Sequence, residues 1–416
     1  MPQKRFNGSR ERALNRARLK SQSGQIWVLV AAAITVVLAS VGMAGDIGVL
    51  YLQRHKMQSA ADSAALAGAD ELNYGDTVSA ARKDASSNGY ANGVGSTTVT
   101  VNNPPTSGQY SGNSKYVEVI ISKVQSTYFL PVLGIGSLNV AARAVAGESN
   151  ASGCMYSLDP TMSGAVSGNG NITINGPCGM IVDSNSSTAL SVSGGSATFD
   201  TPVGIVGGYT IGNATFNPPP HTGIISTGDP LAYYSPPTFS GCDYKNTTVN
   251  KTQTLNPGVY CGGITIKGNA DVTFNPGTYI LNGGGLSASG THTITGTGVT
   301  FYNTQGYSAF APISLSGNVT VNLSAPTSGP MEAMLFFQDR SITSSLMNTV
   351  GGNSSTTYDG AIYMPNSPLT YYGNSSANGY TILVADSLSF SGNVTIGNNY
   401  SSLNDGSPIR TVLLAE

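Results

Sequence analysis

Residues 256–279 read NPGVYCGGITIKGNADVTFNPGTY, and they contain one motif twice, as NPGVY at residues 256–260 and NPGTY at residues 275–279. Between the two copies, apolar and polar residues alternate in short runs, which is the pattern of β-strands. The spacing of 19 residues is close to about one coil of a parallel β-solenoid. The segment therefore predicts a parallel β-solenoid of the right-handed β-helix kind.

The same character extends over residues 150–416, so we expect one mainly β C-terminal domain there. Gly and Asn take the left-handed backbone conformations that the corners of a solenoid need. A β-sandwich is the alternative, because its strands are also short and alternating. Similar runs recur as GNGNITI at 168–174, GNATF at 212–216, GNADVTF at 268–274, GNVTV at 317–321 and GNVTI at 392–396.

All four cysteines lie in this C-terminal region, as two couples separated by 24 and 19 residues: Cys154 with Cys178, and Cys242 with Cys261. Neither couple has the C-x-x-C spacing of a zinc or redox site. An even number of cysteines in an extracytoplasmic segment favours structural disulfides, and pairing within each couple is the simplest arrangement. Buried free thiols are the alternative.

The composition argues against nucleic acid as a partner. Only 10% of the 416 residues are charged, while 52 are Gly and 21 are Pro, which is unlike a cytoplasmic enzyme with charged helical surfaces. Residues 1–20 carry seven Lys or Arg and one acid, whereas residues 151–416 carry five basic and twelve acidic residues. The C-terminal region therefore lacks the basic surface that binds phosphate backbones.

Residues 26–45 read IWVLVAAAITVVLASVGMAG and contain no charge. At about 1.5 Å per residue, a helix of this length reaches roughly 30 Å, the thickness of a bilayer's hydrocarbon core. The basic residues before it predict that the N-terminus stays in the cytoplasm and that the rest of the chain lies outside. The alternative is a cleaved signal peptide, because Gly42, Met43 and Ala44 are small or apolar residues at its end.

The helix is expected to continue beyond the apolar run, since residues 46–72 contain no Pro and have recurring apolar positions. The many alanines in this extension suggest close packing against a partner, either the chain's own later domain or another subunit. A plain amphipathic stalk is the alternative.

Several residues of this helix carry a family resemblance. Gly24-Gln25 precedes the apolar run, Asp46, Gly48 and Tyr51 follow it, and MQSAADSAALAGA occupies residues 57–69. This string resembles the N-terminal anchor of TadG-like proteins of Flp pilus assembly and tight-adherence systems (TadE/G-like). The resemblance implies a single-pass bacterial inner-membrane component whose partners are other pilus-assembly or secretion proteins. It covers about the first seventy residues.

Four residues of the anchor are candidate contacts to assembly partners: Asp46, Tyr51, Gln58 and Asp62. In processed pilins a peptidase cuts after a Gly, and the new fifth residue is an acid. Here Gly24 is followed by Gln25 and Ile26, and Leu29 is the fifth residue. The sequence therefore argues against prepilin-type cleavage.

The organisation expected from these features has four parts: a basic cytoplasmic tail (1–22), the transmembrane and juxtamembrane helix (23–72), a small α/β module (73–149) and the β domain (150–416). Within the module we expect a helix over 76–88 and strands near 97–102, 116–122 and 138–145. Tyr128, Phe129, Leu130 and Leu133 are expected to form a helical turn that faces the core.

The sequence predicts a non-enzymatic protein without cofactor or metal. Aspartates after residue 150 stand singly, and Asp339 with Arg340 is expected to be a surface ion pair. His55, His221 and His292 have no spacing typical of a metal site or a triad. The alternatives are a membrane-tethered adhesin or a polysaccharide-processing enzyme.

Tyrosine pairs at 233–234 and 371–372 are candidate contacts to a surface glycan, or else they cover the side of the solenoid.

Overall fold

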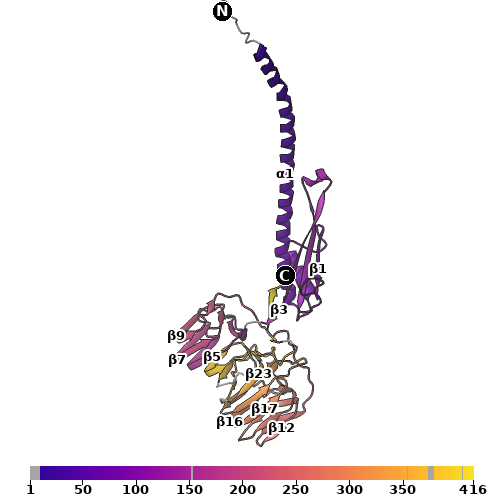
Figure 1. Cartoon of the computed structure of the whole chain (residues 1–416). Coiled ribbons are helices and arrows are strands. Elements are labelled where there is room, and N and C mark those ends of the chain that lie inside the picture. The colour runs from indigo at the N-terminus through magenta and orange to yellow at the C-terminus, as the bar shows by residue number, and fades with distance from the viewer. Residues whose placement is uncertain (1–9, 151–152, 354, 373–378, 405) are drawn as a thin grey trace, which may run out of the picture. The chain divides into compact units, whose positions relative to one another are not determined.

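The computed structural model describes residues 10–150, 153–353, 355–372, 379–404 and 406–416. The chain forms two compact units (Figure 1). The first, called the α/β unit, contains the residues up to Glu148 together with Val412–Glu416, and the second, called the β unit, contains Ser149–Thr411. The sequence predicts one domain over residues 150–416. In the structure, Val412–Glu416 belong instead to the α/β unit.

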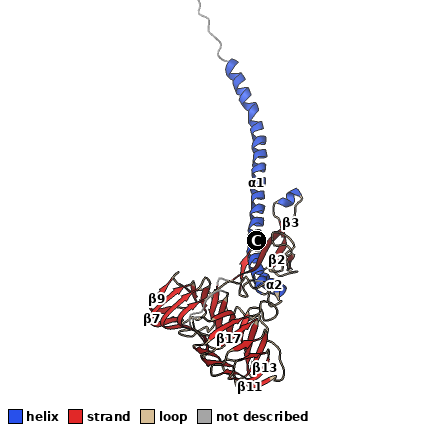
Figure 2. Ribbon diagram, turned by 60° about the horizontal axis from the view of Figure 1, so that its bottom comes forward, coloured by secondary structure: helices blue, strands red, loops and turns tan. Residues whose placement is uncertain are grey.

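In its described residues, the α/β unit has two α-helices, α1 and α2 (Figure 2), and a four-stranded sheet in the order β1-β2-β3-β27. Antiparallel pairing joins β1 to β2 and β2 to β3. The expected helix over 76–88 and the three expected strands correspond to α2, β1, β2 and β3. The elements are α1 (Arg10–Asp70), α2 (Thr77–Ser87), β1 (Thr97–Asn102), β2 (Tyr116–Ser126), the 3-10 helix η1 (Leu130–Leu133), β3 (Ser137–Asn150) and β27 (Arg410–Leu414).

Strand β27 returns from the end of the chain to complete this sheet. The N–H of Val145 donates to the carbonyl of Glu416 at 2.7 Å, and the N–H of Glu416 donates to the carbonyl of Val145 at 3.1 Å. Such a mutual exchange is the pattern of an antiparallel pair. The β unit is therefore inserted between two neighbouring strands of the α/β sheet.

The alanine-rich face of α1 packs against its own unit, on α2 and β2. Gly68 shows how close this packing is, because a Cβ added there would lie 3.1 Å from the Ala81 Cβ and 3.2 Å from Val117 Cγ1. Small residues let the helix approach this closely. The buried residues of this face are Met57, Ala60, Ala61, Ala64, Ala65 and Ala69.

Among the described residues of the β unit, strands β4 to β26 form one 23-stranded sheet with parallel pairing. Parallel ladders do not fit a β-sandwich, which is built from antiparallel sheets. The strands are β4 (Gly153–Ser157), β5 (Val166–Asn175), β6 (Gly179–Val182), β7 (Leu190–Asp200), β8 (Val203–Ile205), β9 (Tyr209–Phe216), β10 (His221–Thr222), β11 (Tyr244–Val249), β12 (Gln253–Leu255), β13 (Gly258–Ile266), β14 (Val272–Phe274), β15 (Gly277–Asn282), β16 (Leu286–Gly290), β17 (Thr293–Thr297), β18 (Val299–Thr304), β19 (Ile313–Gly317), β20 (Thr320–Ser324), β21 (Met334–Gln338), β22 (Asn348–Gly351), β23 (Thr357–Met364), β24 (Leu369–Tyr372), β25 (Thr381–Ala385) and β26 (Leu388–Thr395).

The strand pairs group into ladders that the chain visits in turn. From β15 the chain passes to β16 and β17, and it returns as β18 beside β15. The NPGVY and NPGTY motifs begin at two neighbouring steps of one ladder. In both copies the tyrosine hydroxyl donates to the carbonyl of the motif's own Asn, from Tyr260 to Asn256 at 2.6 Å and from Tyr279 to Asn275 at 2.7 Å.

One ladder runs β11-β13-β15-β18-β21-β23-β25-β4-β6-β8-β10, so its spatial order differs from the chain order. The chain enters at β4 in the middle, winds to β10 at one end, crosses to β11 at the other end and winds back until β25 pairs with β4. Residues 223–243 make this crossing, and we call them the strap. A disulfide between Cys242 and Cys261 ties the end of the strap to β13.

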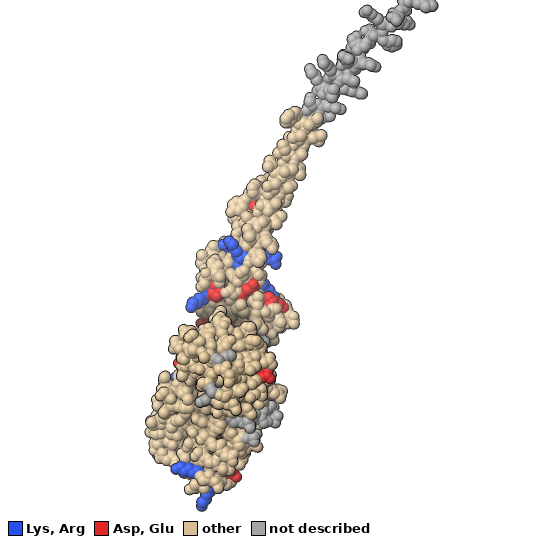
Figure 3. All heavy atoms as spheres, turned by 90° about the vertical axis from the view of Figure 1, so that its left-hand side faces the viewer, with Lys and Arg blue, Asp and Glu red and all other residues tan. Residues whose placement is uncertain are grey.

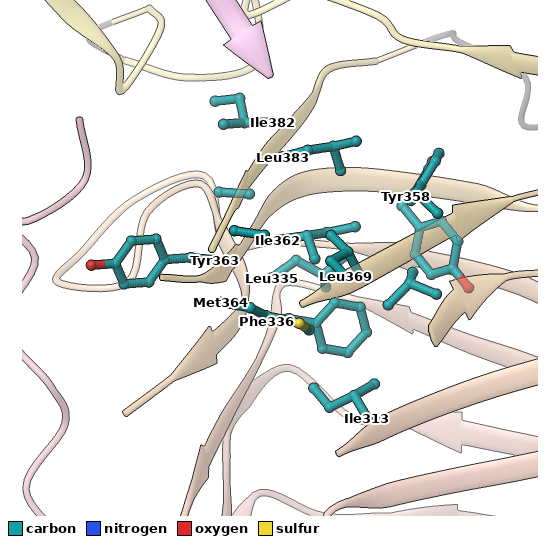
Figure 4. Packing of buried hydrophobic residues seen from close by; sticks show 14 of the residues in the cluster. Ile313, Leu335, Phe336, Tyr358, Ile362, Tyr363, Met364, Leu369, Ile382 and Leu383 are labelled. Carbon is teal, nitrogen blue, oxygen red and sulfur yellow. The ribbon is translucent and has the colours of Figure 1, made fainter. Parts of the chain in front are cut away.

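Buried rings continue from step to step inside the β unit. Tyr279 stacks on Phe301 with ring centroids 5.2 Å apart, and Phe301 stacks on Phe336 at 5.4 Å. Figure 4 shows Phe336 among aliphatic residues such as Ile362 and Leu369. The second disulfide joins Cys154 to Cys178, so both disulfides have the simplest expected pairing.

Candidate functional site

Helix α1 contains the one span, among the described residues, that is long and apolar enough to cross a membrane, within Ile26–Asp70. Its apolar side chains point outward, with Trp27 74% and Leu38 66% exposed. Figure 3 shows a long stretch of this helix without Lys, Arg, Asp or Glu. The α/β unit leaves this part of the helix uncovered.

Asp46 ends the uncharged run and is itself buried, with 1% of its surface exposed. Its carboxylate accepts hydrogen bonds from the backbone N–H groups of Tyr128 and Phe129 at 2.8 Å each, and of Leu130 at 2.7 Å. These N–H groups lie at the start of η1, where a helix leaves donors without partners. Asp46 therefore clamps the turn between β2 and β3 onto α1.

The turn itself corrects a prediction. Residues 128–135, called the hairpin tip, contain the expected helical turn as η1, but they do not face the core: Tyr128 is 71% and Leu133 65% exposed. The reason is that β2 and β3 extend past the core of the unit and carry the tip to the apolar part of α1. There the Phe129 ring lies 2.7 Å from the position that a Cβ on Gly42 would occupy.

The other candidate contacts of α1 divide into internal and exposed residues. Gln58 donates to Asp62 Oδ1 at 2.7 Å and to the carbonyl of Arg143 in β3 at 2.8 Å, so both side chains help to hold the helix on the sheet. Tyr51 is 65% exposed and meets the His55 ring edge-on at 5.8 Å. Of the four, Tyr51 is the one most open to a partner.

One part of the chain matches a known protein family. It is the part of α1 that contains the apolar run, the buried Asp46 and the alanine face. Residues 24–71 match the family described as "Putative Flp pilus-assembly TadE/G-like". The match ends where α1 ends, so it does not reach the sheet or the β unit. No curated protein and no solved structure matches the chain.

Within the α/β unit, one polar cluster joins β2, β3 and the last residue of the chain. Glu118 in β2 has no exposed surface and pairs with Arg143 in β3 at 2.6 Å, while Arg143 also pairs with Glu416. Burial alone raises the pKa of Glu118, but hydrogen bonds from Thr106, Arg143 and Asn102 outweigh it and lower the pKa to about 2. The cluster therefore holds a buried charge that depends on all its donors.

In the β unit, Arg340 does not form the expected surface ion pair with Asp339. Arg340 donates to the carbonyls of Leu231 and Tyr234 in the strap, each at 2.8 Å. Asp339 instead accepts from Thr304 and from Ser341. The several donors of one guanidinium reach both strap carbonyls at once, while the Asp339 carboxylate has its own donors, and sequence adjacency could not show this.

The tyrosine pairs cover or fill the β unit. The hydroxyl of Tyr233 donates to the carbonyl of Pro408, and that of Tyr234 to the carbonyl of Glu332, both at 2.7 Å. Tyr371 is fully buried, so it is not available to a glycan. Tyr363 also contacts the strap: its fully buried ring lies apart from Phe336 and Tyr358 in Figure 4, and its hydroxyl donates to the Asp229 carboxylate.

The β unit brings two aspartates to one groove, which the sequence could not anticipate. Asp159 and Asp386 both line it, and burial, with a further contribution from the charge of Asp159, raises the pKa of Asp386. The Asp159 carboxylate accepts from the N–H groups of Thr161 and Met162. In the described part of the chain, no group of three or more His, Cys, Asp or Glu side chains is placed to hold a metal ion.

Proposed function

We propose that this chain is a non-enzymatic, membrane-anchored component of a Flp/Tad pilus-assembly or tight-adherence apparatus. The observation that carries the proposal is the TadE/G-like match over residues 24–71, which covers the apolar run, Asp46 and the alanine face of α1. A pilus-related role accounts for a segment that combines an apolar run with the polar residues of the TadE/G-like pattern.

The proposed anchor is a single pass through the bacterial inner membrane with the N-terminus in the cytoplasm. The support is the exposed apolar surface of α1 and the seven basic residues among residues 1–20. Fluorescent protein fused before Met1 should be fluorescent, and alkaline phosphatase fused after Glu416 should be active. The reverse pattern contradicts the orientation, and a shortened chain in the soluble periplasmic fraction favours signal cleavage.

The proposed contact to assembly partners lies on the open side of α1 around Tyr51. Tyr51 is 65% and Ile47 61% exposed, whereas the buried Asp46 carboxylate is hydrogen-bonded to the hairpin tip. A photo-crosslinking residue at Tyr51, in cells that produce pili, should capture another pilus-assembly protein. The same residue at Ser87, at the far end of α2, is the matched control. Equal capture from both positions contradicts a contact at Tyr51.

For the β unit, we infer a β-solenoid that contacts partners or a surface glycan. The support is the parallel ladders that the chain visits in rotation, as from β15 through β18. The face of the β unit in Figure 3 carries few charged residues, which suits stacking and hydrogen bonding rather than ionic attraction. Binding of one class on a glycan array, together with normal pili in a deletion strain, would favour the adhesin alternative.

The groove with Asp159 and Asp386 is where the enzymatic alternative is tested. Paired carboxylates are what glycoside hydrolysis requires. The full-length protein should release no oligosaccharide from acidic or neutral polysaccharides. Release that disappears in Asp386→Asn but persists in Asp200→Asn, a change outside the groove, would replace the non-enzymatic proposal.

A further inference from the structure

The hairpin tip presents an apolar surface that its own unit does not cover. Val132 is 89% exposed, Tyr128 71%, Leu133 65% and Phe129 57%. Residues 126–138 read STYFLPVLGIGSL and contain no charge. Four large apolar or aromatic side chains exposed on one short turn are unusual for a surface in water, and they mark an interaction site.

The position of the tip along α1 identifies what it meets. The Phe129 ring lies beside Gly42 and Gly45, in the last turn of the uncharged run at residues 26–45. Gly42 is about 6 Å along the helix from Asp46, at 1.5 Å per residue. The tip is therefore level with the end of the apolar span, where a membrane's hydrocarbon gives way to its headgroups.

The chemistry of the tip fits this depth. Tyr128 is an amphipathic ring, of the kind enriched at membrane interfaces, and the side chains of Val132 and Leu133 are purely apolar. Backbone groups of the tip have hydrogen-bond partners within the protein. Asp46 accepts from three N–H groups, and Thr127 Oγ1 donates to the carbonyl of Ile135. A lipid environment demands such internal hydrogen bonding.

We propose that the hairpin tip inserts into the outer headgroup interface of the bilayer beside α1, as a second membrane contact of the chain. The proposal rests on the proposed anchoring by α1. Two contact points on one lipid surface, clamped together through Asp46, fix the rotation and tilt of the α/β unit at the membrane. A single helix alone leaves that rotation free.

The test uses the sole tryptophan of the chain, Trp27, as an internal standard. The full-length protein is placed in phosphatidylethanolamine–phosphatidylglycerol vesicles, with and without phosphatidylcholine brominated near the top of its acyl chains. Trp27 reports on α1, and Val132→Trp in a Trp27→Phe background reports on the tip. Tyr74→Trp in the same background is the matched control, since Tyr74 lies beyond the far end of α1 and is 54% exposed.

The proposal predicts that brominated lipid quenches Trp27 and the tryptophan at position 132 to a similar extent, and that it leaves the one at position 74 unchanged. Shallow bromine should quench position 132 more than bromine deep in the acyl chains. Quenching of Trp27 without quenching at position 132 overturns the insertion of the tip and points to a protein partner there. Absence of quenching at both positions overturns the anchoring itself.

Discussion

Replacing Glu118 by Gln should loosen the α/β unit, because every group around that side chain is a donor. Asn102 Nδ2 donates at 2.8 Å, Thr106 Oγ1 at 2.7 Å and Arg143 Nε at 2.6 Å. The amide of Gln fills the same volume but turns one acceptor oxygen into an NH₂ donor that faces other donors. The change therefore removes the charge and leaves buried polar groups without partners.

The size of the effect follows from the pKa of Glu118. Its fall from 4.5 to about 2 corresponds to about 3 kcal/mol of preference for the charged form, at about 1.4 kcal/mol per pKa unit. Because the folded pKa is the lower one, this stabilisation is fully present above pH 4.5 and is lost as the pH falls towards 2. Glu118→Gln should therefore lack the wild-type loss of stability in that pH window.

Hydrogen exchange of the β2 amides measures this directly in the full-length protein. At neutral pH, a loss of about 3 kcal/mol corresponds to exchange roughly a hundredfold faster in the variant, if the amides exchange through opening of the unit. Amides of the β unit serve as the internal control and should not change. Exchange of β2 within about threefold of wild type would refute the reasoning, since the buried charge would then contribute little.

Three further predictions concern the other ties in the molecule. Asp46→Ala leaves three N–H groups of the hairpin tip without an acceptor, so their exchange should quicken by at least about tenfold, for bonds to a charged group of about 1.5–3 kcal/mol each. Arg340→Lys cannot serve both strap carbonyls, and limited proteolysis of the strap should become faster, whereas Arg82→Lys on exposed α2 should have no effect. Replacing Cys242 and Cys261 by Ser opens a 19-residue loop and should lower the free energy of unfolding by about 3 kcal/mol. The melting temperature should fall accordingly, and an unchanged melting temperature would contradict a structural role of this disulfide.

Local patterns were enough to predict the elements whose cause is local. The uncharged run at residues 26–45 and the alanine spacing after it indicate one long helix, and α1 spans both. The two NPGxY copies indicate a repeated turn into a strand, and each copy makes the same tyrosine hydrogen bond. The disulfide pairing could also be predicted, because each pair of cysteines is close in the sequence. Cys154–Cys178 joins neighbouring steps of the β unit, and Cys242–Cys261 joins the end of the strap to β13.

The remaining features depend on pairing between distant segments, which no local pattern records. Strand β27 has an ordinary apolar run, and nothing in it indicates that its partner is β3, more than 250 residues earlier. No local pattern indicates the strap either, because the sequence predicts a surface position for Arg340, which in the structure donates to the strap carbonyls of Leu231 and Tyr234. The sequence predicts that the hairpin tip faces the core because apolar residues are usually buried, and the length of the paired strands that carry it past the core is not visible in a local pattern.

Deletion of the gene, followed by counting of surface pili by electron microscopy, tests the central claim most directly. The deletion strain is complemented with the full chain and with a variant in which a short turn replaces Ser149–Thr411, so that β3 and β27 remain paired. The account predicts that pili disappear on deletion, return with the full chain and return at least in part with the shortened variant. An undiminished number of pili in the deletion strain would contradict a role in pilus assembly.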